Sequence, residues 1–171
     1  SYGVPERDGK CFVEIKKKFK GVVYKRRVEM ALPETKIWLK SGIRPENFTQ
    51  IHREIEWFMQ FYRPEPRMYL AYDRIAMFGN ENSELRMTFD GAIRWRTEDL
   101  DLTHGDRGAL ILEPGQRLLE VKIPGAMPLW MAELFDELNI RSSSFSRYGA
   151  CYQQLFKESG NQLILGDVLS A

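Results

Sequence analysis

Short runs in which apolar residues alternate with charged ones constrain this chain more than any other feature. In residues 84–90 (ELRMTFD), the three apolar side chains fall on one face of an extended strand and the polar ones on the other. Residues 11–18 and 116–123 repeat this two-residue period. Such strands place one side in a core and the other against water or a ligand, so the sequence predicts a sheet with one polar face.

The other elements follow from hydrophobic periodicity and from turn residues. Strands are predicted at 11–18, 22–30, 67–77, 84–90, 92–97 and 116–123, with a short strand near 109–112. Helices are predicted at 33–41, from Pro45 to Tyr62, at 128–138 and at 145–158, followed by a tail at 160–171. At 171 residues the chain is predicted to form one domain, residues 1–171, of the α+β class with mainly β structure.

Composition excludes several kinds of partner. Lys and Arg number 25 against 24 for Asp and Glu, so the formal net charge of +1 favours neither nucleic acid nor a membrane surface. Any anion site must therefore come from the sorting of charges onto faces. No apolar run reaches the length of a membrane span. No P-loop, nucleophile elbow or dinucleotide-binding motif is present.

The cysteines and histidines show no metal-ligand spacing. Cys11 and Cys151 lie far apart in the sequence, which favours a reduced, intracellular protein and leaves one long-range disulfide open. His52 and His104 are expected on a helix surface and in a loop.

The polar strand faces have an unusual composition. They contain few Ser, Thr, Asn or Gln residues and repeat a basic residue beside a single acid or tyrosine. Basic side chains bind phosphate oxygens, and carboxylates bind Mg²⁺ or Mn²⁺, so the pattern suits a phosphate site with a divalent cation. An ordinary solvated sheet face explains the alternation equally well, and the pattern alone leaves both interpretations open.

Five runs in fixed order resemble the VTC domain, a polyphosphate-polymerase domain of the triphosphate tunnel metalloenzymes, here of the bacterial type. They are FVEIKKKFKGVVYKRRV (12–28), YDRIAM (72–77), LRMTFDGAIRWR (85–96), LLEVKIPGAMPLWM (118–131) and SSFSRYG (143–149). The resemblance extends from about residue 11 to residue 157, which is nearly the whole chain.

The resemblance implies an antiparallel β-barrel that forms a tunnel, with helices packed outside. Polymerase members of the family transfer the terminal phosphate of ATP to a polyphosphate chain with Mn²⁺ or Mg²⁺. The expected partners are therefore ATP and polyphosphate, without nucleic acid and without a membrane segment in this chain. The expected location is the cytoplasm, with attachment to the inner face of a membrane through a partner left open.

The resemblance also assigns roles to individual residues. The expected catalytic residues are Lys16, Arg74, Arg86 and Lys122. The expected phosphate-binding residues are Lys25, Arg27, Tyr72, Ser146 and Arg147. Glu120 is the expected metal ligand, and Glu14 and Asp90 are divided between a metal ligand and a structural partner of an arginine.

The chain departs from the family pattern at two places. Strands with a lysine and a K-x-R-x-R segment would precede Ser1, so the barrel is expected to be incomplete, or completed in a homodimer or domain-swapped pair. Arg147 replaces the usual lysine of the FSKYG motif. Two alternatives to polymerisation stay open, a triphosphatase and a non-catalytic module that binds polyphosphate or inositol phosphates. The triphosphatase is less favoured because the EIK strand lacks the first glutamate of ExExK.

Overall fold

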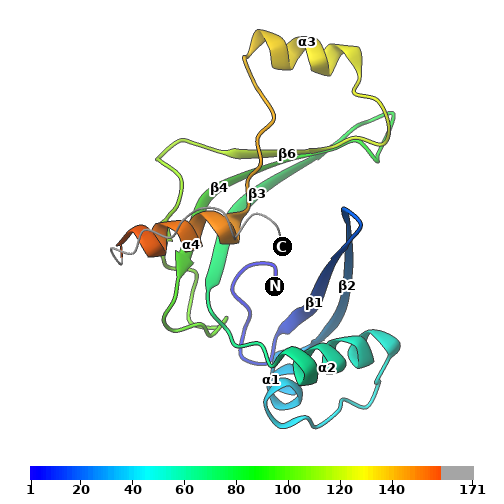
Figure 1. The fold of residues 1–171 in the computed structure, drawn as a ribbon, viewed down its shortest axis with the longest axis vertical. Coiled ribbons are helices and arrows are strands. Elements are labelled where there is room, and N and C mark those ends of the chain that lie inside the picture. The colour runs from blue at the N-terminus through cyan, green and yellow to red at the C-terminus, as the bar shows by residue number, and fades with distance from the viewer. Residues whose placement is uncertain (159–171) are drawn as a thin grey trace. The chain divides into compact units, whose positions relative to one another are not determined.

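In the computed structural model, which describes residues 1–158, the first two strands form an antiparallel hairpin (Figure 1). They are β1 (Lys10–Phe19) and β2 (Val22–Ala31), both close to their predicted bounds. The two-residue loop between them has positive φ at Lys20 (47°) and at Gly21 (80°). Positive φ at both loop residues matches the right-handed twist of a hairpin.

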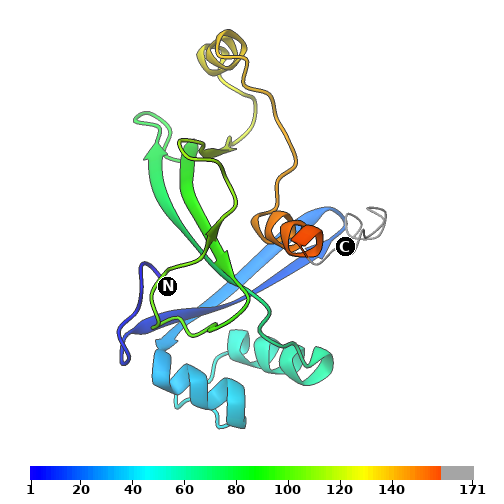
Figure 2. The same ribbon diagram turned by 90° about the vertical axis from the view of Figure 1, so that its left-hand side faces the viewer.

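Two helices cover one face of this hairpin. They are α1 (Leu32–Ser41) and α2 (Gln50–Tyr62), and Figures 1 and 2 show both beside the hairpin end where β2 stops. The core that the three elements share consists of Ile15, Met30, Trp38 and Ile55. Residues of one parity in each strand therefore face the helices, as the two-residue period predicts.

The start of α2 corrects the sequence prediction. The helix begins at Gln50 and not at Pro45, because Thr49 is its N-cap. The backbone N–H of Thr49 donates to His52 Nδ1 at 3.0 Å, an interaction that fixes the first turn. His52 packs against the Trp38 and Phe48 rings and is buried, so the prediction that it lies on the helix surface is wrong.

The remaining strands form a four-stranded sheet with β4 (Arg86–Arg96) in the middle. On one side lies β3 (Tyr69–Phe78). On the other side, β6 (Leu118–Lys122) pairs antiparallel with the first half of β4, and the short β5 (Ala109–Leu110) pairs with its second half.

The structure corrects the two strands predicted at 84–90 and 92–97, which are one continuous strand, β4. Ala92 lies within it at φ 44°, in the left-handed region, so the strand has a local irregularity there in place of a turn. Buried side chains occupy even positions before Ala92 and odd positions after it. The irregularity therefore exchanges the two faces of the strand.

Two helices follow the sheet, α3 (Leu129–Glu137) and α4 (Arg147–Glu158). Both agree with prediction to within two residues, and the predicted tail at 160–171 lies outside the described residues. None of the helices in residues 1–158 is long and apolar enough to cross a membrane. Cys11 and Cys151 are buried free thiols.

Contacts divide the chain into two units. Unit 1 consists of Ser1–Tyr69 with Thr97–Asp106, and unit 2 consists of Leu70–Arg96 with the chain from Arg107 onward. Each unit has its own sheet, and the α+β class is confirmed. The strands described in residues 1–158 are not joined into one closed barrel, so the tunnel remains a prediction, as does the single domain.

The core of unit 1 generates a stability prediction. Ile55 is 4% exposed and Ile37 is 50% exposed, and both lie in helices of this unit. Ile55→Ala should lower the free energy of unfolding by about 2–5 kcal/mol because it leaves a cavity. Ile37→Ala, the matched control, should change it by less than about 0.5 kcal/mol in urea denaturation. Equal losses in the two variants would contradict the described core.

Candidate phosphate site

The register of β4 and β6 brings several of the predicted residues to one face of unit 2. Arg86 lies opposite Lys122, and Thr88 lies opposite Glu120. Opposed residues point to the same side of an antiparallel sheet, and so do alternate residues along β4. Asp90 therefore belongs to this face together with the two pairs.

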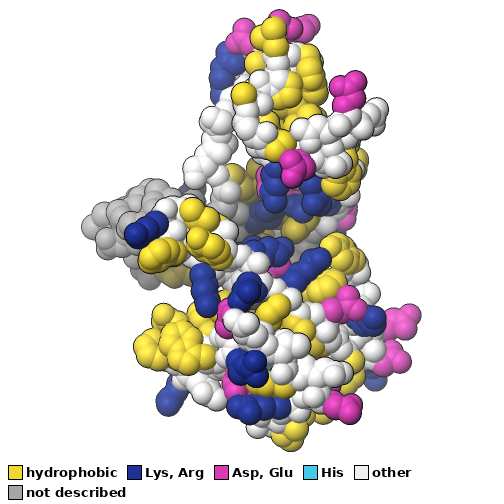
Figure 3. All heavy atoms as spheres, turned by 90° about the vertical axis from the view of Figure 1, so that its right-hand side faces the viewer, with side chains coloured by type: hydrophobic (Ala, Val, Ile, Leu, Met, Phe, Trp, Pro, Cys, Tyr) yellow, Lys and Arg dark blue, Asp and Glu magenta, His cyan; other side chains and the backbone are white. Residues whose placement is uncertain are grey.

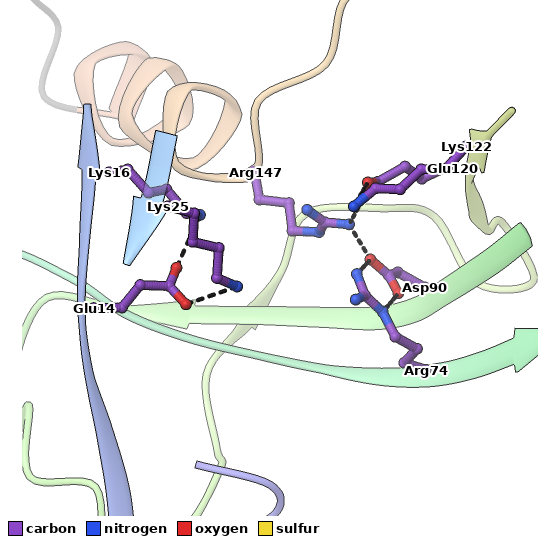
Figure 4. A network of polar contacts seen from close by, with 8 residues as sticks. All are labelled: Glu14, Lys16, Lys25, Arg74, Asp90, Glu120, Lys122 and Arg147. Carbon is purple, nitrogen blue, oxygen red and sulfur yellow. Dashed lines mark hydrogen bonds and ion pairs between the residues drawn. The ribbon is translucent and has the colours of Figure 1, made fainter. Parts of the chain in front are cut away.

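Strand β3 adds Tyr72 and Arg74 to the same cluster, and Figure 4 shows Arg74 beside Asp90. Arg74 binds the Asp90 carboxylate through two parallel hydrogen bonds, from Nε to Oδ1 at 2.6 Å and from Nη2 to Oδ2 at 2.7 Å. Its guanidinium carbon lies 4.9 Å from the centre of the Tyr72 ring. A bidentate arginine–carboxylate pair of this kind is both strong and specific in orientation.

The first residue of α4 completes the cluster. Arg147 donates from Nη2 to Asp90 Oδ2 and, at 3.5 Å, to Glu120 Oε2. Its guanidinium carbon also lies 4.9 Å from the centre of the Tyr72 ring. One carboxylate and one aromatic ring thus hold two arginines from separate elements.

Burial and charge act against each other at Asp90, which is 0% exposed. Burial opposes its ionisation, but the hydrogen bonds and positive charges of Arg74 and Arg147 outweigh burial and hold the pKa of this carboxyl below its ordinary value. The hydrogen bond to Asp90 in turn raises the pKa of Arg74. Asp90 is therefore a buried, ionised residue at neutral pH.

Glu120 and Lys122 are held more loosely. Lys122 Nζ lies 3.8 Å from Glu120 Oε1, and the side chains are 67% and 43% exposed respectively. Arg86 lies over the Phe78 ring, with its guanidinium carbon 5.1 Å from the ring centre. Glu120 and Lys122 are therefore the more exposed part of the cluster.

A second basic face lies on the hairpin of unit 1. Glu14 contacts Lys25 at 2.7 Å and Lys16 at 3.6 Å, as Figure 4 shows. Lys16 and Lys25 are also directly opposed across the two strands, which brings like charges together. Arg27 lies over Phe12 on this face, at 4.5 Å from the ring centre.

On the opposite side of the hairpin, the basic residues form ion pairs with helix α2. Arg26 and Lys17 both pair with Glu54 of α2. Figure 3 shows, on one face of the molecule, Lys and Arg side chains close to acidic and hydrophobic ones. The basic residues on this side are therefore neutralised locally by an acidic partner.

A comparison with protein-family models decides the family. The VTC domain model matches residues 1–156. This chain belongs to the VTC domain family. A search of curated proteins returned no match. Family membership confirms the resemblance that the five sequence runs indicated, and it indicates a function related to polyphosphate.

The FSRYG segment of this VTC domain has a visible structural role. The Ser146 hydroxyl accepts a hydrogen bond from the Gly149 N–H at 3.2 Å and so caps the start of α4. This cap lies next to Arg147 and fixes where that side chain leaves the helix. The phosphate-binding role of Ser146 remains a prediction.

Other basic residues of the VTC domain fall outside the predicted set. Arg94 pairs with Asp73 at 3.0 Å, and because Asp73 and Arg74 are consecutive on β3, this pair lies on the face opposite Asp90. Arg117 and Arg141 line a groove of about 830 Å³ in unit 2 that Glu120 and Arg147 also line. The alternation of the strands does not predict a role for Arg117 or Arg141. The only sequence signal for either residue is that Arg141 directly precedes the serine run.

The carboxylates differ in how well they fit a divalent cation. Both oxygens of Asp90 are engaged by arginines, so Asp90 does not fit a metal ligand. Within residues 1–158, no group of three or more His, Cys, Asp or Glu side chains is arranged to hold a metal ion. The loosely held Glu120 fits a cation that takes its other ligands from phosphate, as Mg²⁺ commonly does.

The buried Asp90 predicts a specific pH dependence. The fold lowers the pKa of Asp90, so its ionised carboxylate contributes fully to stability at any pH above the ordinary pKa of 3.8. This contribution is lost as the pH falls through the lowered pKa of the folded protein. The difference in the free energy of unfolding between the wild type and Asp90→Asn should be large at about pH 6 and should shrink below about pH 3.5 in urea denaturation.

The control for this prediction is Asp136→Asn. Asp136 pairs with Arg141 at 3.0 Å, but both side chains are more than half exposed, so its removal should cost less than about 1 kcal/mol. A difference for Asp90→Asn that stays constant across this pH range would show that the carboxylate is not a stabilising buried charge.

Proposed function

We propose that this VTC domain is a phosphotransferase of the polyphosphate-polymerase type, which moves the terminal phosphate of ATP to a polyphosphate chain. The observation that carries the proposal is the cluster on one face of the unit 2 sheet. Four basic side chains surround two carboxylates there, which leaves two formal positive charges. The basic side chains are Arg74, Arg86, Lys122 and Arg147.

The arginines keep donors that a phosphate chain could use. A guanidinium carries five N–H groups, and the two bonds to Asp90 occupy only two of those of Arg74. The remaining donors form a planar fork suited to phosphate oxygens. The side chain of Arg74 is 31% exposed and that of Arg147 is 23% exposed, so both are partly accessible.

Phosphoryl transfer requires positioning and charge neutralisation more than covalent chemistry. In the proposed reaction, fixed basic groups align the ATP triphosphate with the end of the acceptor chain and neutralise its equatorial oxygens. The attacking group is a phosphate oxygen of the acceptor chain that is already ionised, so no general base is needed. As it bonds to the γ-phosphorus, the bond to the oxygen that bridges the β- and γ-phosphates breaks, and ADP leaves. Mn²⁺ or Mg²⁺, bound through Glu120 and phosphate oxygens, would supply further neutralisation of charge.

The hairpin of unit 1 offers a second set of phosphate contacts. Lys16, Lys25 and Arg27 lie on the hairpin face that the helices do not cover. The direct opposition of Lys16 and Lys25 costs energy that a bound anion would relieve. We propose the enclosed tunnel from the family resemblance alone.

A non-catalytic polyphosphate-binding module is the second candidate. It is favoured by the lack of a three-ligand metal group within the described part of the chain and by the contact of Arg147 with Glu120. A triphosphatase is less favoured. Phe12 occupies the position two residues before Glu14, where such enzymes carry a glutamate, and it packs against Arg27.

The proposal predicts how variants affect polymer synthesis. With ATP and Mn²⁺, the wild-type protein should form long polyphosphate on a gel, and Arg74→Gln or Glu120→Gln should lower the rate by about a hundredfold or more. Arg74→Gln removes a positive charge at the transferred phosphate, and Glu120→Gln removes the carboxylate that would hold the cation. Arg94→Gln, on the same sheet but on its other face, should keep the wild-type rate.

Two results would overturn this assignment. Wild-type rates in both Arg74→Gln and Glu120→Gln would place the chemistry elsewhere. Tight binding of polyphosphate by the wild type with no synthesis, and with affinity unchanged by Glu120→Gln, would establish the binding module in its place.

A further inference from the structure

We propose that Asp90 is a positioning residue, which holds Arg74 and Arg147 in the orientation that receives phosphate before any phosphate arrives. This inference rests on the proposed phosphate-binding role of the two arginines. In this inference Asp90 does not bind a metal ion, and it affects phosphate binding only by orienting the two arginines.

Both oxygens of the Asp90 carboxylate already accept hydrogen bonds from arginines. Asp90 is 0% exposed, its Oδ1 accepts from Arg74, and its Oδ2 accepts from both Arg74 and Arg147. A divalent cation at these oxygens would have to displace charge-assisted hydrogen bonds and would stand beside two guanidinium charges. The surroundings of Asp90 therefore suit arginine as its partner and not a metal ion.

Each of the two guanidinium groups is held by two different neighbours. Asp90 holds the edge of both groups, and the Tyr72 ring lies 4.9 Å from each guanidinium carbon. Arg74 comes from β3, whereas Arg147 comes from the start of α4, 57 residues beyond Asp90. A single residue thus sets the relative orientation of two donors from separate elements.

Fixing long side chains in advance lowers the entropic cost of binding a ligand. This effect opposes the simple electrostatic one. Asp90→Asn removes a negative charge, so charge alone predicts that an anion binds more tightly to the variant. Loss of the positioning contact predicts the reverse, and the sign of the change separates the two.

The test uses tripolyphosphate as the probe, without metal, titrated into the whole protein by calorimetry. Asp90→Asn should weaken binding by about tenfold or more, since two rotamer-rich side chains lose their fixed orientation. The control is Asp73→Asn, which removes the same charge from a 72% exposed side chain on the other face and should leave affinity unchanged or slightly improved. Tighter binding to Asp90→Asn, or equal affinities in the two variants, would overturn the inference.

A second background distinguishes positioning from a general loss of structure. In the Arg74→Gln/Arg147→Gln protein, adding Asp90→Asn should cause no further loss of tripolyphosphate affinity, because Asp90 then has no arginine to position. A further tenfold loss in that background would show that Asp90 acts through the fold as a whole.

A measurement on the wild-type protein avoids the risk that a variant fails to fold. In side-chain NMR spectra without ligand, the Nε–H groups of Arg74 and Arg147 should give restricted signals, distinct from that of Arg67, whose side chain is 73% exposed. Signals of Arg74 and Arg147 that are as mobile as that of Arg67 before tripolyphosphate is added would contradict preorganisation.

The single-arginine variants distinguish a failure of the positioning role from a failure of the proposed phosphate site. If Arg74→Gln and Arg147→Gln leave tripolyphosphate affinity unchanged, the proposed phosphate site fails and the inference fails with it. If both weaken binding and Asp90→Asn does not, the phosphate site stands and only the positioning role is overturned.

Discussion

The burial of the Asp90 carboxylate is the constraint on which the site of unit 2 depends. An ionised group without solvent contact is costly unless strong donors surround it, and removal of one partner from such a pair is strongly destabilising. Arg74 and Arg147 meet this requirement, one from the sheet and one from the first turn of α4. The same interaction that stabilises the fold therefore gathers two positive groups beside Tyr72.

The rest of the site is arranged around this fixed centre with less restraint. Glu120 and Lys122 lie on the neighbouring strand β6. Their side chains are more exposed than that of Asp90, and their charged groups are farther apart than those of Arg74 and Asp90. A phosphate site benefits from the fixed arginines, because donors held in place supply orientation to the ligand. Membership in the VTC family indicates a polyphosphate-related function.

Much of this arrangement was predictable from alternation alone. The two-residue period of β1, β4 and β6 places Lys16, Arg86 and Glu120 on polar faces, and the strand registers of the structure agree with those faces. Two boundaries were missed for local reasons. The Thr49–His52 cap does not follow the usual Ser/Thr-x-x-Glu pattern, and Gly91 before Ala92 imitates a turn inside a continuous strand. The Asp90–Arg147 contact was beyond sequence reasoning because it joins elements 57 residues apart, so Asp90 could equally be interpreted as a metal ligand.

A crystal structure of the protein with bound tripolyphosphate would test the central claim most directly. The phosphate oxygens should lie within hydrogen-bonding distance of Arg74 and Arg147 on the sheet face that carries Tyr72, with Asp90 still bridging the two arginines. Phosphate bound instead on the opposite face of the sheet, beside Arg94, or bound by Arg147 only after its separation from Asp90, would contradict it.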